Sequence, residues 1–283
     1  ESRERMPSVL VTGAGRGIGL AITRHLSARG WDVYATARSA SALVDLARLP
    51  GVHPTRLDIS DRASLAALAA QLPAQLDAVV NNAGIIVNGP VEGLALADLS
   101  RQLDVNVTAQ IGVTQAVLPK IRAAKGRIVF ISSVSGLIAT PGTGAYNASK
   151  FALEALADAL RIELRPWDIH VSLIEPGPIR TDMWSEVLVE HDRMAAALTD
   201  EHRALYAAHL AGTRKLLARM QKLAADPAKV VKAVDHALSA RRPKSRYLLD
   251  VASRVQKTVV GLTPTAINDA VLAAATTTKS PKG

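Results

Sequence analysis

Short apolar runs rich in Val, Ile and Leu alternate along the chain with longer stretches whose apolar residues are spaced as on one face of a helix. The short runs predict strands, and their nearly continuous apolar character is typical of parallel strands covered on both faces of a sheet. The seven predicted strands are Ser8–Thr12, Asp32–Ala37, Val52–Leu57, Ala78–Asn81, Arg127–Ser132, His170–Glu175 and Arg246–Leu249.

The longer stretches predict helices, and the regular alternation favours a doubly wound α/β fold with right-handed crossovers and helices on both faces of the sheet. An insert from about Met183 to Ala225 has few glycines and predicts one or two helices that form a lid. We expect one catalytic domain over 8–250, a disordered N-terminus over 1–7, and a C-terminal extension over 251–283 that is frayed from Thr276. The other predicted helices are Ile18–Arg29, Arg62–Gln71, Leu96–Ala124, Ala145–Arg165 and Pro227–Ala240.

A glycine-rich loop, Gly13-Ala14-Gly15-Arg16-Gly17-Ile18-Gly19, joins the first predicted strand to the first predicted helix. Glycine adopts positive φ and lets the backbone approach a phosphate closely, and the helix N-terminus offers unpaired N–H groups. A strand, a glycine loop and a helix in this order indicate a dinucleotide-binding, Rossmann-type unit. Further polar and glycine-containing segments, at Asn81–Gly84, Ser133 and Pro176–Gly177, also follow predicted strands, where ligands bind in such sheets.

Tyr146 and Lys150 are four residues apart near the start of a predicted helix, so they lie over the same face. We expect the lysine charge to favour the phenolate and to lower the pKa of Tyr146, so that the phenol exchanges a proton with an alcohol or ketone. The alternative interpretation of this common spacing is a pair of solvated helix residues.

These segments together resemble the short-chain dehydrogenases/reductases of the single-domain type, with the resemblance running from Val9 to about Thr181 and more weakly to Leu249. The motifs that carry it are Thr12-Gly13-x3-Gly17-Ile18-Gly19, Leu57-Asp58, Asn81-Asn82-Ala83-Gly84, Asn106, Ile131-Ser132-Ser133 with Gly136, Tyr146-x3-Lys150, and Pro176-Gly177 with Thr181.

The resemblance implies a catalytic set of Asn106, Ser133, Tyr146 and Lys150. Tyr146 would exchange the proton, Ser133 would hold the substrate oxygen, and Lys150 would bind the nicotinamide ribose. Asn106 would bend its helix and hold a water, and Ser135 is the rival for the role of Ser133. The implied cofactor-binding residues, besides Tyr146 and Lys150, are Gly13, Gly15, Arg16, Gly17, Ile18, Gly19, Arg38, Asp58, Ile59, Asn82, Ala83, Gly84, Pro176, Gly177, Ile179 and Thr181.

The segment after the second predicted strand favours NADP(H) over NAD(H). Enzymes that prefer NAD usually carry an acid there for the ribose 2′-hydroxyl. Ala37 occupies that place and Arg38 follows, while Arg16 adds a cation within the glycine loop. Guanidinium groups bind a phosphate through paired, charge-assisted hydrogen bonds. Asp58 would meet the adenine edge, or would be an acid at a helix N-terminus, and both can hold together.

Composition excludes several other classes of function. The 283-residue chain has no cysteine, so thiol nucleophiles and disulfides are excluded. No apolar run of about 20 residues predicts a spanning helix, and no signal peptide is visible, so we expect a cytoplasmic protein. The net charge of +9 is spread out and aromatics are only 3% of residues, which argues against a nucleic-acid partner. The basic stretch 241–257 is interpreted as a solvated loop or, alternatively, as a contact with an anionic membrane surface or with an acidic substrate tail.

The resemblance implies an alcohol–carbonyl oxidoreductase (EC 1.1.1.-). The lid and the long C-terminal part resemble steroid- and retinol-type members and favour a bulky hydrophobic substrate, with a 3-oxoacyl-thioester reductase or a non-catalytic NADP(H) sensor as alternatives. Small residues on the helix Ala145–Arg165 favour a homodimer or homotetramer. His202 and His209, seven apart, are expected to be ordinary histidines without a metal. The substrate residues implied by the resemblance are Ile138, Thr140, Met183 and Trp184.

Overall fold

The computed structural model describes residues 6–250 and 262–277, apart from the side chains of Met183 and Ser185. The expectations for 1–5, for 251–261 and for the last six residues of the tail lie outside the described residues. Within the described part, no helix is both long and apolar enough to cross a membrane.

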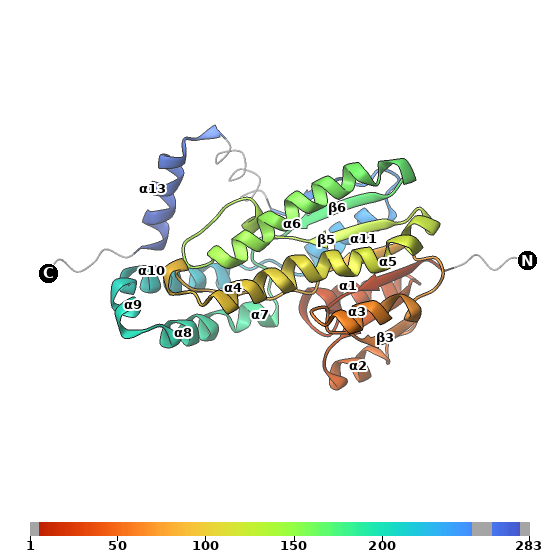
Figure 1. Ribbon diagram of the computed structural model, residues 1–283, viewed down its shortest axis with the longest axis horizontal. Coiled ribbons are helices and arrows are strands. Elements are labelled where there is room, and N and C mark those ends of the chain that lie inside the picture. Colours follow the sequence, from red (N-terminus) through yellow and green to blue (C-terminus); the bar gives the residue numbers. More distant parts are fainter. Residues whose placement is uncertain (1–5, 251–261, 278–283) are drawn as a thin grey trace, which may run out of the picture.

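A sheet of seven parallel strands forms the centre of the molecule, as the sequence predicts (Figure 1). The order across the sheet is β3-β2-β1-β4-β5-β6-β7. Strands β2 and β3 are thus added on one side of β1 and the later strands on its other side, so the strand order reverses between β1 and β4. Ligands bind at the carboxyl ends of the strands around such a point. The strands are β1 (Ser8–Val11), β2 (Asp32–Ala37), β3 (Val52–Arg56), β4 (Ala78–Asn81), β5 (Arg127–Ile131), β6 (His170–Glu175) and β7 (Arg246–Leu248).

Several strands end one residue earlier than predicted. At three of them the next residue still donates a hydrogen bond to the neighbouring strand: Thr12 N to Val80 O (3.1 Å), Leu57 N to Ala37 O (3.1 Å) and Ser132 N to Ile174 O (2.8 Å). The predicted and observed ends of these strands therefore differ by one residue that still bonds to the sheet.

Helices cover both faces of the sheet and create two apolar cores (Figure 1). One core contains Ile22 and Leu26 of α1 (Gly17–Ala28), Leu46 of α2 (Ala40–Leu46) and Val234 of α11 (Ala228–Ser239), and the other contains Leu68 of α3 (Arg62–Leu68). Residues of α5 (Gln110–Ala124) and α6 (Gly144–Glu163) complete the second core. The doubly wound architecture predicted from the alternation of elements is confirmed.

The helix predicted over Leu96–Ala124 is interrupted in its middle. It consists of α4 (Leu96–Leu103), a π-helical turn η3 (Asp104–Ala109) and α5. The π turn contains Asn106, whose side chain is fully buried. Asparagine competes with the backbone for hydrogen bonds, and π turns often mark functional sites.

The lid contains more helices than the one or two expected. The four helices are α7 (Asp182–Ser185), α8 (Val187–Ala197), α9 (Asp200–Leu205) and α10 (Ala207–Lys222), and they form one group at the lower left of Figure 1. Thr199 explains one of the breaks, because its hydroxyl accepts a hydrogen bond from His202 N (3.1 Å) and caps α9.

Two helices were not predicted. The first, α2, has only seven residues and is capped by Ser39. The second, α13 (Thr265–Thr276), packs against α10, where a Cβ on Gly212 would lie 2.2 Å from Thr276 O. The expectation of a tail frayed from Thr276 is therefore wrong at its first residue, which is buried and ends the helix.

Candidate active site

The glycine loop between β1 and α1 is folded tightly against the loop that follows β4. Gly13 and Gly17 have φ of +66° and +56°. A Cβ on Gly19 would lie 2.3 Å from Gly13 O, and one on Gly13 would lie 2.9 Å from Ala83 Cα. Gly13 is therefore required by both conformation and space, Gly17 by its conformation, and Gly19 by the lack of space for a side chain.

Thr12 and Asn82 connect these two loops through hydrogen bonds. The buried hydroxyl of Thr12 accepts from Asn82 N (3.0 Å) and Ala83 N (3.1 Å). Asn82 Nδ2 donates to Thr12 O (3.0 Å) and Gly13 O (3.2 Å). Asn82 therefore holds the glycine loop in place. Thr12 has the same role, which the sequence analysis did not assign to it.

The loops after β2 and β3 place Arg38 and Asp58 at the other end of the same edge. Arg38 is exposed and Ala37 is buried, and neither position carries an acidic residue. The pKa of Asp58 is lowered, mainly by hydrogen bonds from Ser60 and to a smaller extent by the charge of Arg38. Asp58 does not cap a helix, because Asp61 caps α3 instead. Ile59, beside Asp58, is buried and contributes to the core.

Asn106 joins the π turn to the chain after Gly84. Its Oδ1 accepts from Ile85 N (2.8 Å), and its Nδ2 donates to Ile85 O (2.9 Å) and to Ser149 Oγ (3.2 Å). A Cβ on Gly84 would lie 3.2 Å from Asn106 Oδ1. Asn106 thus fixes the loop after β4 relative to the helix that carries Tyr146.

The side chain of Ser133 lies beside the Tyr146 phenol at the carboxyl end of β5 and favours its ionised form. Ser133 is buried, and its Oγ also donates to Pro176 O (3.4 Å) and accepts from Ser135 N (3.1 Å). Ser135 uses its backbone to stabilise this turn, and its carbonyl accepts from Asn147. The geometry favours Ser133 over Ser135 as the partner of the phenol.

Lys150 lies one helical turn after Tyr146 and is buried. Its ammonium donates to Ile131 O (2.8 Å), and Nζ lies 5.7 Å from the centre of the Tyr146 ring. Burial lowers the pKa of Lys150 to about 8, while the charge of nearby Glu154 opposes that change.

The expectation that Lys150 lowers the pKa of Tyr146 is wrong when the protein is considered without a bound cofactor. Burial of the phenol raises its pKa to about 12, and the hydrogen bond from Ser133 only partly opposes this. The physical reason is that burial removes the water that would solvate a phenolate. The lysine ammonium meanwhile donates to the Ile131 carbonyl. Tyr146 therefore holds its proton firmly near neutral pH.

A cluster of ion pairs lies behind Lys150. Arg246 of β7 contacts Glu154 (2.9 Å), Asp158 (2.7 Å) and Glu175 (3.1 Å), and the carboxylate of Glu175 is completely buried. Arg246 belongs to the basic stretch that was interpreted as a solvated loop. That interpretation is wrong for Arg246, although Arg241 and Arg242 are exposed. The cluster connects the catalytic helix to the sheet.

Asn147, next to Tyr146, organises the loop between β5 and α6. Its Nδ2 donates to Ser135 O (3.0 Å) and Ile138 O (2.8 Å), and its Oδ1 accepts from Thr140 N (3.2 Å) and Thr143 Oγ1 (2.8 Å). The sequence analysis missed this residue, although a polar residue inside a catalytic motif was a usable signal.

The segment after β6 crosses over the glycine loop. Ile179 is buried and pairs with Ala225, and a Cβ on Gly17 would lie 3.6 Å from Thr181 Cβ. Pro176 O accepts from Val134 N (3.1 Å), which brings this segment, with Gly177, beside Ser133. The loops after β1, β4, β5 and β6 therefore meet at one edge.

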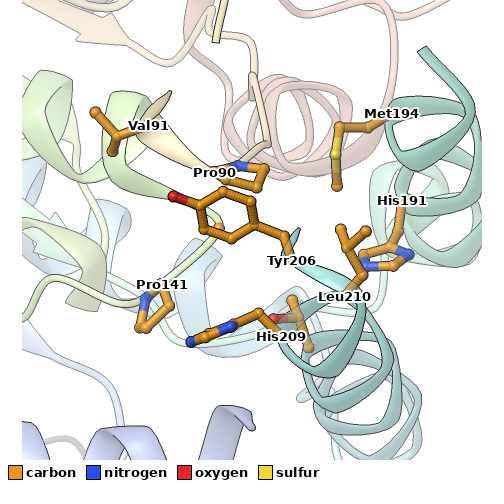
Figure 2. A pocket seen from close by; sticks show the side chains of 10 residues that line it. Pro90, Val91, Pro141, His191, Met194, Tyr206, His209 and Leu210 are labelled. Carbon is orange, nitrogen blue, oxygen red and sulfur yellow. The ribbon is translucent and has the colours of Figure 1, made fainter. Parts of the chain in front are cut away.

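A cavity of about 220 Å³ lies between the lid and this edge (Figure 2). Its walls come from Pro90 and Val91 after β4, Pro141 before α6, and the lid residues Met194 and Leu210. The four implied substrate residues contribute little to it. Ile138 and Thr140 do not line it, Trp184 lines a separate cavity with Thr181, and the Met183 side chain lies outside the described part.

The sequence analysis missed most residues of this cavity, although it predicted the lid that supplies several of them. His209 lines the cavity, whereas His202 lies against Gly93. Among the described residues, no group of acidic residues and histidines is arranged to hold a metal ion.

The edge fits a dinucleotide cofactor. The N-terminus of α1 has no side-chain cap, because Arg16 at the N-cap makes no capping hydrogen bond. The positive-φ glycines Gly13 and Gly17 lie in the same loop and add no side chain there. Free N–H groups at a helix N-terminus bind phosphate. The glycine loop, Arg16, Arg38 and Asp58 would hold the adenosine and pyrophosphate, and Lys150, Ile179 and Thr181 would hold the nicotinamide end.

The family model for short chain dehydrogenase matches residues 7–192. The chain belongs to the short-chain dehydrogenase family. This family consists of oxidoreductases whose fold binds a nicotinamide cofactor, so the geometry of the edge and the family membership agree.

Similar proteins support the same conclusion over the whole chain. Retinol dehydrogenase 5 of Homo sapiens is 36% identical over 287 residues, which cover 95% of this chain and 90% of the relative. The 3-amino-tetrahydro-pyrrolizinone reductase of Xenorhabdus hominickii is 39% identical over 70% of this chain and 71% of its own. The crystal structure of a short-chain dehydrogenase from Streptomyces avermitilis matches with a TM-score of 0.75 and 28% identity over 96% of this chain and 95% of that one. The predicted resemblance to retinol-type members is confirmed.

Replacing the Thr12 hydroxyl tests the connection between the loops. Thr12→Val leaves the backbone N–H groups of Asn82 and Ala83 without their acceptor, so the free energy of unfolding should fall by about 2 kcal/mol or more. Thr12→Ser keeps the oxygen and should lose only about 0.8 kcal/mol, for one buried methyl group. Urea denaturation measures both values. Equal stability of the two variants would show that the hydroxyl does not connect the loops.

Proposed function

We propose that this protein interconverts an alcohol and its ketone or aldehyde with NADP(H), with Tyr146 as the proton donor and acceptor. The observation that carries the proposal is the meeting of the Ser133 and Tyr146 hydroxyls beside the buried Lys150. Two neighbouring hydroxyls form a ready site for one carbonyl oxygen. The phenol can donate its proton to that oxygen, and Ser133 can do so by turning its single proton away from Pro176 O.

The proton chemistry follows from the two pKa values. With a pKa of about 12, Tyr146 carries its proton at neutral pH and can give it to the substrate oxygen during reduction. With a pKa of about 8, Lys150 is charged near neutral pH and stabilises the phenolate that remains. When bound, the nicotinamide supplies the hydride that reaches the carbonyl carbon. Ser133 holds the oxygen in place during both directions.

The preference for NADP(H) is supported by charge. Arg16 and Arg38 lie on the two loops that face each other beyond the glycine turn, where a Cβ on Gly15 would lie 3.2 Å from Ala37 Cβ. Arg38 is exposed and no acid replaces it at the end of β2. This arrangement suits a ribose 2′-phosphate better than a 2′-hydroxyl.

The cavity supports a bulky, largely apolar substrate. Its walls contain Pro90, Val91, Pro141, Met194 and Leu210 beside the start of the catalytic helix. The similarity to retinol dehydrogenase 5 agrees with an apolar alcohol or aldehyde. A 3-oxoacyl thioester remains the second candidate from the sequence, and no feature of the cavity favours it.

The outer face of α6 supports a homodimer or a homotetramer. Ala148, Ala155 and Ala159 are exposed on it, and Phe151 is 44% exposed. Small residues allow two helices to approach closely, so we infer that this face packs against the same face of a second copy.

Tyr146→Phe tests the proton donor. We expect kcat for carbonyl reduction to fall by at least about 100-fold, because general acid catalysis contributes about 10²–10⁴-fold. The Kd for NADPH should change by no more than several-fold. Tyr34→Phe, on β2, is the matched control and should keep normal rates. Near-normal turnover of Tyr146→Phe would contradict the assigned role, and wild-type protein that binds NADPH but reduces no member of a broad carbonyl panel would favour a sensor.

Arg38→Asp tests the cofactor preference. Hydrogen bonds to charged groups contribute about 1.5–3 kcal/mol, so the Kd for NADPH should rise by about 10- to 150-fold while that for NADH changes little. Arg48→Asp is the control, because Arg48 is exposed beyond α2 and pairs only with Asp45 among the described residues. Fluorescence titration with both cofactors measures the difference. Equal weakening of both cofactors by Arg38→Asp would argue against a 2′-phosphate site.

A further inference from the structure

The cavity beneath the lid adjoins the start of the catalytic helix. Pro141 and Gly142 line it, and Gly142 is four residues before Tyr146, a span of at most about 14 Å along an extended chain. Val91, another wall residue, contacts Gly144, where a Cβ would lie 2.9 Å from Val91 Cγ2. Gly142 O also accepts from Gly89 N (2.8 Å). The cavity is therefore within reach of the remote part of a substrate whose oxygen lies at Tyr146.

One polar side chain in the cavity wall is almost completely buried. His191 of α8 is only 3% exposed, and its Nε2 has no hydrogen-bond partner among the described residues. It lies on the lid side of the cavity, beside Leu210 (Figure 2). Nε2 itself is covered, so a ligand in the cavity reaches it only when a neighbouring side chain turns aside. A buried polar atom without a partner costs about 1–3 kcal/mol, so a ligand that gives Nε2 a hydrogen bond would recover that free energy.

The ring of His191 is held in a defined orientation by its neighbours. Its Nδ1 lies 3.3 Å from Asp192 Oδ1. Arg214 of α10 fixes Asp192 through two hydrogen bonds, of 2.8 Å and 3.0 Å. When the only ring proton is on Nδ1, facing the carboxylate, Nε2 is an acceptor. In this tautomer the group that would satisfy Nε2 is a hydrogen-bond donor.

Two of the three other polar residues of the cavity, Tyr206 and His209, are less suited to this task than His191, and the third is Thr213. The Tyr206 hydroxyl donates to Glu92 Oε2 (2.7 Å), which closes the lid against the chain after β4. His209 stands 5.9 Å from the Tyr206 ring, centre to centre, and is only half-buried. Water can therefore form a hydrogen bond with His209 more readily than with His191.

We propose that the cavity receives the remote end of the substrate and that His191 Nε2 accepts a hydrogen bond from a hydroxyl group there. The preferred substrate is then an apolar carbonyl compound, or the matching alcohol, that carries a second hydroxyl far from the reacting carbon. This inference rests on the proposed function, since it places the reacting oxygen at Tyr146. It assigns to His191 the recognition of that second group.

A pair of substrates tests the proposal. We would measure kcat/KM with NADPH for medium-chain methyl ketones and for the same ketones with a terminal hydroxyl. At the best chain length, wild type should prefer the hydroxylated ketone by about tenfold or more, because a site built to bond a hydroxyl discriminates strongly against its absence. His191→Leu should reduce this ratio to about one and leave the plain ketone within about threefold, because only the hydrogen bond is lost.

Two further variants separate recognition from folding. His191→Gln keeps a hydrogen-bonding group and should retain part of the preference, whereas His209→Leu should leave the ratio unchanged. His191→Leu removes an unsatisfied polar atom but also loses the contact of Nδ1 with Asp192, so its melting temperature should stay close to that of wild type. If this variant does not accumulate, His191→Met provides the same measurement.

The outcomes distinguish this inference from the proposed function. Turnover of both ketones by wild type with no preference, or a preference that survives in His191→Leu, overturns the role of His191 alone. Absence of turnover with every ketone overturns the proposed function. Calorimetric binding of the hydroxylated ketone then still decides the role of His191, because equal affinity in wild type and His191→Leu overturns it and weaker binding in the variant supports it.

Discussion

The site depends on one buried cation, the Lys150 ammonium at the carboxyl end of β5. Its hydrogen bond to Ile131 O and the nearby charge of Glu154 offset the loss of water around it. Glu154 in turn shares Arg246 with Asp158, so the catalytic helix is joined to the last strand by opposite charges. Burying a charge is costly unless it is paired and hydrogen-bonded. The hydrogen bond and ion pairs that stabilise the buried charge of Lys150 therefore also fix its distance from Tyr146.

A second constraint brings the rest of the edge together. In a parallel sheet every strand ends at the same edge, so loops far apart in the sequence meet there without long connections. The Thr12 hydroxyl joins the loop after β1 to the loop after β4, and Asn106 joins the latter to α6. The turn around Ser133 is bonded to Pro176 after β6. Hydrogen bonds between neighbouring loops thus hold the cofactor edge and the catalytic hydroxyls in one rigid unit.

Much of this was predictable, because strands and loops follow from local patterns, whereas the missing parts depend on distant contacts. The seven strands and the residues at their ends were visible in apolar runs and glycines. One break in the lid did have a local signal, because Thr199, followed by Asp200 and Glu201, is a typical helix start and caps α9. The pKa of Tyr146 depends on burial by other elements, which its spacing from Lys150 does not reveal. For the same reason, the polar group in the cavity, His191, had no signal along the chain.

The pH dependence of carbonyl reduction tests the central claim most directly. Lys150 is charged below its pKa of about 8, so kcat/KM should be level below that pH and should fall above it as the ammonium loses its proton. Glu154→Gln removes a charge that raises the pKa of Lys150, so the falling limb should move to lower pH. Asp158→Asn, like Glu154→Gln, loses a contact with Arg246, but it should leave the pH of the falling limb unchanged. A limb at the same pH in wild type and Glu154→Gln would contradict the account, because the charge of Lys150 would then not control the proton transfer.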